Sequence, residues 1–460
     1  MKNLNRDILS LAIPSILANI TIPLVGMADI AVAGHLGGSY GGAALIGGIT
    51  IGTMLFDLLY WNFSFLRSGT GGLTAQAYGA YVMPGADRAS HAAGIRAILL
   101  RALRIALVSG VALIALQWVI LWLAFLFVDC SPEVRELASQ YFKIRVWAAP
   151  ATLSLFAFKG WFIGLQDTVK PMIADLLVNG LNIALSFGLG FGLCGLPAMG
   201  FAGVAAGTVI AQWCGFAYAA IAARRVLSVM PGPDRASPTP AGAFFRMNRD
   251  LVLRSLGMIA VYIGFTVISA KYGDTMLAVS SILMKLLLVF SYFTDGFAYA
   301  GEALTGKFIG ARDREGVQSA VRGTFLWGWG LAGAFMLLYG LGGVPAFRLL
   351  TSDVTVVEAG REFILWLLLM PVIGVPAFIW DGIFTGATET SAMRNSTLLC
   401  AVGFFAVWFG GLWLVGSITG SAPEGPLAIH ILMAAYFVHL AIRSIYLTTV
   451  RKRVCRVGAK

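Results

Sequence analysis

The sequence predicts an all-α integral membrane protein, with twelve transmembrane helices in two pseudo-symmetric six-helix lobes. Hydrophobic residues make up 58% of the 460-residue chain, and charged residues make up only 12%. Soluble domains average about 25% charged residues. The mean hydropathy is +0.82, and long apolar runs recur from one end of the chain to the other. These observations exclude an ordinary soluble protein.

Apolar runs of membrane-crossing length account for the twelve predicted helices. A helix needs about 20 apolar residues to cross a hydrocarbon core of about 30 Å. The first run is too long for a cleaved signal peptide, whose apolar region spans roughly 7–15 residues. In chain order we expect spans at about 9–35, 43–66, 97–128, 136–165, 172–194, 198–223, 252–271, 276–304, 321–349, 358–386, 397–418 and 426–449.

The positive charges predict the orientation of these spans. The formal net charge is +11, and Lys and Arg gather in alternate connections. The connections over 36–42, 195–197 and 419–425 contain neither residue type. By the positive-inside rule, both termini are cytoplasmic. The basic balance therefore reflects topology, and we expect no nucleic-acid partner.

A polar stretch near the middle of the chain separates two sets of six spans. Residues 230–247 form the predicted cytoplasmic linker, which includes the Pro- and Gly-rich sequence MPGPDRASPTPAGA. We therefore predict an N-lobe over 1–229 and a C-lobe over 248–460.

Short motifs recur in both halves and indicate an internal repeat. Asn-Arg-Asp at 5–7 returns at 248–250, and the pattern Gly-x3-Gly-x2-acid-Thr at 160–168 returns at 382–390. Six spans in each half, both starting on the same side, predict parallel repeats. Such repeats enclose a cavity between two bundles, which is the usual geometry of alternating access.

The first span carries the most informative ionisable residue. Asp29 is the only formal charge between Asp7 and Asp57. A charged residue at the centre of a spanning helix costs roughly 2.5–3.5 kcal/mol on insertion scales, and it usually faces a wet cavity or a partner. Pro14 and Pro23 each remove a backbone donor, so we expect this helix to bend. A bent helix that holds one ionisable group is typical of a transporter.

The fifth span carries a polar stripe. Asn179, Asn182 and Ser186 lie at i, i+3 and i+7, on one face of a helix. The equivalent span of the second half has no such stripe beyond its first turn. We expect these side chains to face Asp29 and to form a small hydrophilic chamber with it. The alternative is interhelical hydrogen bonding alone, worth about 0.6 kcal/mol for each bond.

Other ionisable residues lie within the spans. Asp57 either faces the same cavity or pairs with a basic residue near the inner surface. Asp295 and Glu302 lie seven residues apart on one face of the eighth span. Because a lysine within a span usually has a carboxylate partner, the pattern favours a structural pair of Lys285 with Asp295 or Asp381.

Residues suited to metal binding or to catalysis form no recognisable motif. The five cysteines show no CxxC spacing and no accompanying His cluster, so we expect no metal and no cofactor. Cys130 and Cys194 both fall near predicted external ends, but a role as small apolar fillers is favoured over a disulfide. Asp, His and Arg do not cluster at one membrane face, which argues against a membrane-embedded enzyme.

Several segments together resemble the multidrug and toxic compound extrusion (MATE) family. They are DIAVAGHLGG, FLRSGTGGLTAQAYGA, GWFIGLQDTVKPM, NGLNIAL, DGFAYAGEALTG and DGIFTGATETSAMRNS, and within the family they are similar to the bacterial DNA-damage-inducible F branch. The resemblance covers essentially the whole chain. It implies multidrug efflux: export of organic, often cationic and amphipathic compounds across the bacterial cytoplasmic membrane, driven by entry of H⁺ or Na⁺.

The resemblance also implies roles for individual residues. Asp29 matches the family's first-span carboxylate that binds the coupling cation, and Pro14 matches the proline at which that helix bends. Asn182, with Asn179 beside it, matches the fifth-span asparagine of the same site. Thr208 matches a sixth-span threonine.

One departure from the family pattern bears on the coupling ion. Where many relatives carry a second carboxylate one turn after Asn182, this chain has Ser186. A hard cation such as Na⁺ needs several oxygen ligands, so the loss favours H⁺ over Na⁺. In the expected cycle, deprotonated Asp29 attracts substrate from the cytoplasm. Protonation from outside then weakens substrate binding and rearranges the first helix at Pro14.

Other functions remain as alternatives. A flippase for a lipid-linked precursor would require a strongly cationic central cavity, yet Lys285 is the main basic residue that we expect deep in a span. A channel is less suitable than a transporter, because parallel repeats and a polar site in only one half favour alternating access over a static pore. We expect organic small molecules and membrane lipids as partners, and a monomer, because one chain holds both lobes.

Overall fold

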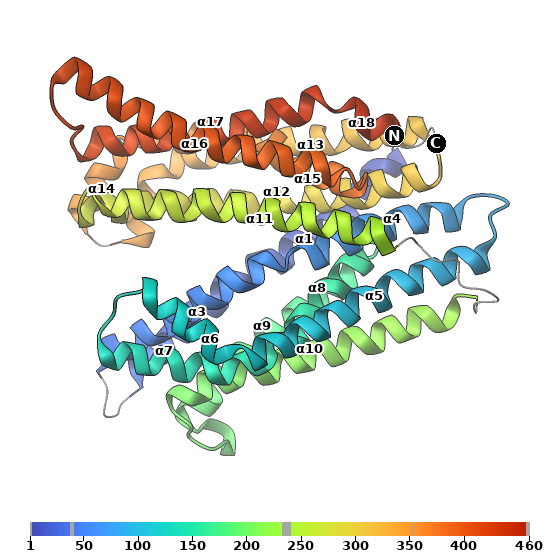
Figure 1. The fold of residues 1–460 in the computed structure, drawn as a ribbon, viewed down its shortest axis with the longest axis horizontal. Helices are drawn as coiled ribbons and strands as arrows, with labels where there is room; N and C mark the ends of the chain where they lie inside the picture. The colour runs from blue at the N-terminus through green and yellow to red at the C-terminus, as the bar shows by residue number, and fades with distance from the viewer. Residues whose placement is uncertain (1, 37–40, 232–240, 352, 457–460) are drawn as a thin grey trace. The chain divides into compact units, whose positions relative to one another are not determined.

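Helices account for nearly all of the structure, because backbone inside a bilayer must satisfy its hydrogen bonds within its own segment. The computed structural model describes residues 2–36, 41–231, 241–351 and 353–456 (Figure 1). Within these ranges, twelve helical spans are long and apolar enough to cross a membrane. The predicted all-α fold with twelve spans is therefore confirmed.

The first half contains the helices up to α10. Three spans are made of consecutive helices, because α1 is followed directly by α2, α3 by α4, and α7 by α8 through a short 3₁₀ turn. The elements are α1 (Lys2–Ile20), α2 (Ile22–His35), α3 (Gly42–Asn62), α4 (Phe65–Val82), α5 (Arg88–Ala115), α6 (Gln117–Phe127), α7 (Pro132–Arg145), η1 (Val146–Ala148), α8 (Ala149–Gly164), α9 (Val169–Phe191), η2 (Leu193–Gly195) and α10 (Phe201–Val229).

The second half contains six long helices and two short ones. Of the predicted linker, residues 232–240 lie outside the described residues, and the segment that follows is already helical. The elements are α11 (Ala241–Ala270), α12 (Asp274–Gly310), α13 (Arg314–Leu350), α14 (Val354–Arg361), α15 (Ile364–Gly386), α16 (Thr390–Thr419), α17 (Gly425–Thr449) and α18 (Lys452–Arg456).

Contacts divide the chain into two compact units. The first unit is Leu17–Ala241, and the second unit is Met1–Ile16 together with Gly242–Lys460. Residues 1–16 group with the second unit because α1 packs on α12 and α13. Ile16 lies against Gly296, and Ile8 lies against Gly323. The first span thus begins in one unit and ends in the other, whereas we assigned all of it to the N-lobe. That these units act as the two transport lobes stays a prediction.

The repeated glycines make equivalent helix crossings in both units. In the first unit, Gly160 and Gly164 on α8 lie so close to α4 that a Cβ atom would overlap its backbone. In the second unit, Gly382 and Gly386 on α15 lie equally close to the backbone of α12. Close approach of backbones at small residues is a common way for membrane helices to associate. The Gly-x3-Gly repeat read from the sequence is therefore a repeated packing motif.

The turn after each Gly-x3-Gly motif is repeated as well. Gln166 and Thr388 both have left-handed backbone, with φ of 65° and 56°. Asp167 N–H donates to the carbonyl of Phe162, and Glu389 N–H donates to the carbonyl of Phe384. The two halves therefore share local backbone structure as well as helix order.

The first span is interrupted at Thr21. Helix α1 runs through Pro14 without a break and ends at Ile20, and α2 begins at Ile22. Pro23 lies in the first turn of α2, where its missing N–H is tolerated but where it cannot continue the preceding helix. Thr21 Oγ1 donates to the carbonyl of Ala18 at 2.7 Å. The break in helical structure thus precedes Pro23, and Pro14 lies within a continuous helix.

Candidate functional site

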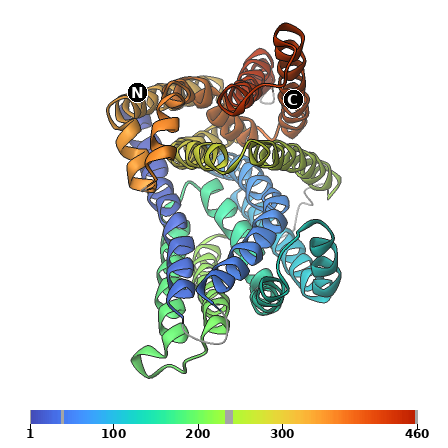
Figure 2. The ribbon, with the colours of Figure 1, turned by 90° about the vertical axis from the view of Figure 1, so that its left-hand side faces the viewer.

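The polar face of the fifth span is brought against the first span by close packing in the first unit. Helices α2 and α9 run in the same direction, since Thr21 meets Asn179 and Asp29 meets Ser186 further along. Helices α9 and α10 pack antiparallel (Figure 2), with Gly203 against Leu189 and Gly215 against Val178.

Asp29 lies in the interior of the first unit. Its exposed fraction is 5%, and Ser186 Oγ donates a hydrogen bond of 2.9 Å to its Oδ1. Within the described part of the chain, Asp29 makes no ion pair at hydrogen-bonding distance. A carboxylate in this setting is costly when charged, and its charge is readily neutralised by a proton or by a cation.

The two asparagines of the stripe bind different helices. Asn179 Nδ2 donates to Thr21 Oγ1 at 2.6 Å, at the break between α1 and α2. Asn182 Nδ2 donates to Thr208 Oγ1 at 2.8 Å. The buried Asn182 Oδ1 has no hydrogen-bond partner among the described residues. It is therefore an acceptor that a protonated carboxyl or a cation can use.

The structure adds a cation that the sequence analysis did not identify. Arg145, partly buried at the end of α7, donates from Nη1 to Thr53 Oγ1 at 3.2 Å and to the Tyr141 hydroxyl at 3.1 Å. Its guanidinium also lies 4.9 Å from the ring centre of Phe56. A guanidinium within a span requires such partners. The sequence signal was a basic residue inside the span predicted at 136–165, two residues after Lys143.

Arg145 interacts electrostatically with both carboxylates of this region, Asp57 and Asp29. Asp57 is exposed on α3, one turn after Thr53. Of the two expectations for Asp57, a basic neighbour is therefore present. The site holds two carboxylates and one guanidinium, so its charge balance depends on whether Asp29 carries a proton.

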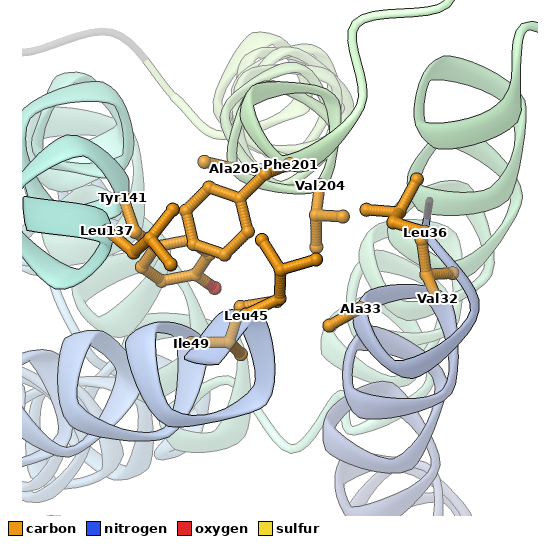
Figure 3. Packing of buried hydrophobic residues seen from close by; sticks show 10 residues of the cluster. All are labelled: Val32, Ala33, Leu36, Leu45, Ile49, Leu137, Tyr141, Phe201, Val204 and Ala205. Carbon is orange, nitrogen blue, oxygen red and sulfur yellow. The ribbon is translucent and has the colours of Figure 1, made fainter. Parts of the chain in front are cut away.

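An apolar layer borders this polar region, and Figure 3 shows how its side chains pack. Val32 lies one turn after Asp29 on α2, and Tyr141 lies one turn before Arg145 on α7. Helix α7 runs antiparallel to α2, because α7 is parallel to α3 and α3 is antiparallel to α2. One turn forward on α2 and one turn back on α7 therefore lead toward the same end of the unit. The buried members of the layer are Val32, Ala33, Leu36, Leu45, Ile49, Leu137, Tyr141, Phe201, Val204 and Ala205.

The candidate residues of the second unit form a separate group. Asp381 on α15 makes ion pairs with Arg254 of α11 and with Arg443 of α17, and Arg443 Nε donates to its Oδ1 at 3.1 Å. Lys285 is exposed on α12 and makes no ion pair within the described ranges. The partners of Asp381 are therefore two arginines, and the favoured pairing with Lys285 was wrong. Asp295 interacts electrostatically with Arg443.

Glu302 lies on α12 at the helix crossing with α15. The side chain is fully buried, and its backbone carbonyl lies against Gly386. Of the remaining sequence expectations, Cys130 and Cys194 are free thiols. No group of three or more metal-ligating His, Cys, Asp or Glu side chains occurs in the part of the chain that the structure describes.

Comparison with known proteins gives a family match over most of the chain. The sequence profile of the MatE family matches residues 14–187 and 251–408. DNA damage-inducible protein F of Escherichia coli is 33% identical over 452 residues, which cover 97% of this chain and 92% of the relative. A probable multidrug resistance protein NorM of Thermotoga maritima is 24% identical over 88% of this chain and 83% of that protein.

Solved structures show the same fold. A crystal structure of a MATE protein in the bent conformation matches with a TM-score of 0.81 at 18% identity, covering 99% of this chain and 97% of that one. A MOP superfamily transporter from Pyrococcus furiosus matches with a TM-score of 0.80 at 18% identity, covering 99% of this chain and 96% of the other.

Proposed function

This chain belongs to the MatE family and is a multi-pass membrane transporter rather than an enzyme; from this premise we propose that it exports organic compounds in exchange for protons that enter through Asp29. The observation that carries the proposal is the setting of Asp29. The carboxylate is 5% exposed, is bonded to Ser186 and is bordered by an apolar layer.

Proton coupling rests on the ligands around this carboxylate. Ser186 stands where a second carboxylate would favour a metal cation, and a neutral hydroxyl donor cannot compensate the charge of Na⁺. A proton needs only one basic oxygen, and Asn182 Oδ1 is a free acceptor in the same helix. Sodium remains the alternative coupling ion, because hydroxyl and amide oxygens of Ser186, Asn182 and Thr208 are potential ligands.

Coupling to conformation runs through the first span. Asp29 lies on α2, and the same span includes α1, which belongs to the second unit up to Ile16. Thr21 at the break is held by Asn179. We propose that protonation of Asp29 changes the packing of α2 on α9 and that α1 transmits this change. The implied proline hinge at Pro14 and the break at Thr21 are then two candidate bending points in one span.

Organic and amphipathic substrates are the class that the family favours. The Thermotoga maritima relative is described as a probable multidrug resistance protein. We propose that substrate is bound when Asp29 is charged and released when Asp29 is protonated, so that substrate and proton occupy the transporter in turn. We further propose that both termini are cytoplasmic, that the protein works as a monomer in the inner membrane, and that it supports drug resistance.

The flippase alternative depends on unpaired cations within the spans. The sequence analysis expected Lys285 as the main one, but Arg145, Arg254 and Arg443 also lie within spans. Arg254 and Arg443 both pair with Asp381, and Arg145 faces Asp57 and Asp29. Since each of these three has a carboxylate neighbour, they provide little net positive charge for a pyrophosphate. Four other cations that have no carboxylate partner in the described structure, Arg314, Arg322, Arg451 and Lys452, lie near the ends of α13 and α17 rather than deep in the spans, so the antiporter remains the favoured function.

The proposal can be tested with purified protein in liposomes loaded with a fluorescent cationic dye. A proton gradient and a sodium gradient are imposed separately at constant membrane potential. We expect dye movement with the proton gradient and none above the protein-free control with the sodium gradient. Dye movement that follows the sodium gradient at constant pH would mean that Na⁺, and not H⁺, is the coupling ion. No dye movement under either gradient would bring the flippase forward.

A further inference from the structure

A cavity with a strongly basic rim opens in the second unit, and none of the residues around Asp29 lines it. Its volume is about 910 Å³, at the upper end of the range for ligand sites. It lies between the start of α13, the middle of α15 and the end of α17 with α18. The basic side chains that line it are Arg314, Arg322, Arg451 and Lys452.

These four cations lack counter-ions. The lining contains no Asp or Glu, and none of the four side chains makes an ion pair or hydrogen bond within the ranges that the structure describes. All four side chains are exposed, so water and salt screen part of their mutual repulsion, and an anion bound among them would relieve the rest. Elsewhere in the same unit, the arginines at 254, 394 and 443 are each paired with a carboxylate.

The wall of the cavity is apolar and aromatic. Phe325 packs against Trp380 with ring centres 4.9 Å apart, and Trp329 and Pro376 complete this surface. Trp380 Nε1 already donates to Thr448 Oγ1 at 2.9 Å. Its ring therefore presents an apolar face without an unsatisfied donor. A ligand that fills both parts must join an anionic group to an apolar one.

The position along the helices identifies the source of such a ligand. Arg314 is the first residue of α13, and Arg451 lies two residues after Thr449, the last residue of α17, so these cations lie where spans end. Phospholipid head groups lie at that level, with acyl chains alongside the helices. Basic pockets between membrane helices recognise anionic head groups, and guanidinium groups bind phosphate oxygens in pairs.

We propose that this cavity is a binding site for an anionic phospholipid, with the phosphate held by Arg314, Arg322, Arg451 and Lys452 and the chains against Phe325, Trp329 and Trp380. The site is independent of the transported substrate. It ties the start of α13 to the end of α17 through the lipid, which stabilises that end of the second unit.

The test is lipid binding to the full-length protein in detergent, measured by native mass spectrometry and by the thermal unfolding midpoint. The probes are dioleoyl phosphatidylglycerol, dioleoyl phosphatidylcholine and glycerol 3-phosphate, which has no chains. The pocket variant is the double substitution R322E with R451E. The control is R361E with R453E, which makes the same change in net charge at two exposed arginines of the same unit outside the lining.

We expect wild type and control to retain phosphatidylglycerol over phosphatidylcholine, and to unfold at higher temperature with it. The pocket variant should bind phosphatidylglycerol at least about five-fold more weakly for each arginine replaced. That factor is the contribution of one basic residue near an anionic surface. Equal retention of both lipids by wild type, or an unchanged preference in the pocket variant, would overturn the proposal. Full competition by glycerol 3-phosphate would also overturn it, because the site would then serve a soluble anion.

Discussion

Ser186 on α9 donates its hydroxyl hydrogen to the carboxylate of Asp29 on α2, at 2.9 Å. These residues are 157 positions apart in the sequence, and their contact joins the first and fifth spans at the most buried carboxylate of the first unit. We therefore propose that the residue at position 186 controls which ion Asp29 can exchange.

Replacing Ser186 with Asp should change the coupling ion. A second carboxylate beside Asp29 supplies the charge and oxygen ligands that a hard cation requires. We expect the Ser186→Asp variant to gain sodium-driven dye export that wild type lacks. Ser186→Asn, which adds a neutral side chain of the same size, is the matched control and should show no sodium response. A sodium response in both variants, or in neither, would remove Ser186 as the determinant.

Replacing Arg145 with Gln should impair transport more than the same change elsewhere on α7. The substitution removes the positive charge that faces Asp57 and Asp29 and leaves Thr53 and Tyr141 with a weaker partner. Loss of a hydrogen-bonded charge costs about 1–3 kcal/mol, which we expect as a lower unfolding temperature and slower proton-driven export.

Arg135 provides the control on the same helix, because it is exposed and lies 4.7 Å from the ring centre of Phe125 without a carboxylate partner in the described structure. Arg135→Gln should change stability by less than about 0.5 kcal/mol. If both variants export at the wild-type rate, Arg145 has no part in coupling.

The bending point of the first span can be assigned by two proline substitutions. Pro23→Ala restores a backbone donor near the break at Thr21, and Pro14→Ala removes a proline from within a continuous helix. If the break at Thr21 is the hinge, Pro23→Ala should reduce transport strongly while the protein still folds. A larger loss from Pro14→Ala would assign the hinge to Pro14, as the family resemblance implies. Circular dichroism and expression in the membrane serve as folding controls.

The repeated glycine crossings predict equal losses in the two units. An added methyl group at Gly164 or at Gly386 would overlap backbone atoms of the facing helix, so each Gly→Ala change should destabilise by about 1–3 kcal/mol or more. Gly180 has no atom within 4 Å of a built Cβ, and Gly180→Ala should be neutral or stabilise by up to about 1 kcal/mol. Thermal unfolding of the three variants measures this. If Gly→Ala is tolerated at only one of Gly164 and Gly386, the two crossings do not contribute equally to stability.

Much of the fold could be predicted from the sequence, because hydrophobic length determines a membrane helix almost by itself. The repeat at 160–168 and 382–390 was visible for the same reason, since close crossings need glycine at fixed spacing. The break at Thr21 was harder to predict. Both Pro14 and Pro23 remove a donor, but only the neighbouring hydrogen bonds decide which of them ends a helix.

The site was predicted only in part, because spacing along one helix reveals a polar face but not the partners of that face. Of the stripe, Ser186 bonds Asp29 as expected, whereas Asn179 bonds Thr21 in the first span and Asn182 bonds Thr208 in the sixth. Arg145 was missed although it lies inside the span predicted at 136–165, because its partners Thr53 and Phe56 belong to another span and spacing does not reveal them. The partners of Asp381 were misassigned because Arg254 and Arg443 are 127 and 62 residues away, and sequence spacing carries no information about such contacts.

The most direct test of the central claim is proton-driven dye export by Asp29→Asn in liposomes. Asn keeps the size of the side chain and a hydrogen bond with Ser186 but cannot exchange a proton at neutral pH. Asp87→Asn, at the exposed N-terminus of α5, makes the same chemical change where Asn remains a good helix cap. The account predicts that wild type and Asp87→Asn export dye under a proton gradient and that Asp29→Asn does not. Export by Asp29→Asn at the wild-type rate would contradict it.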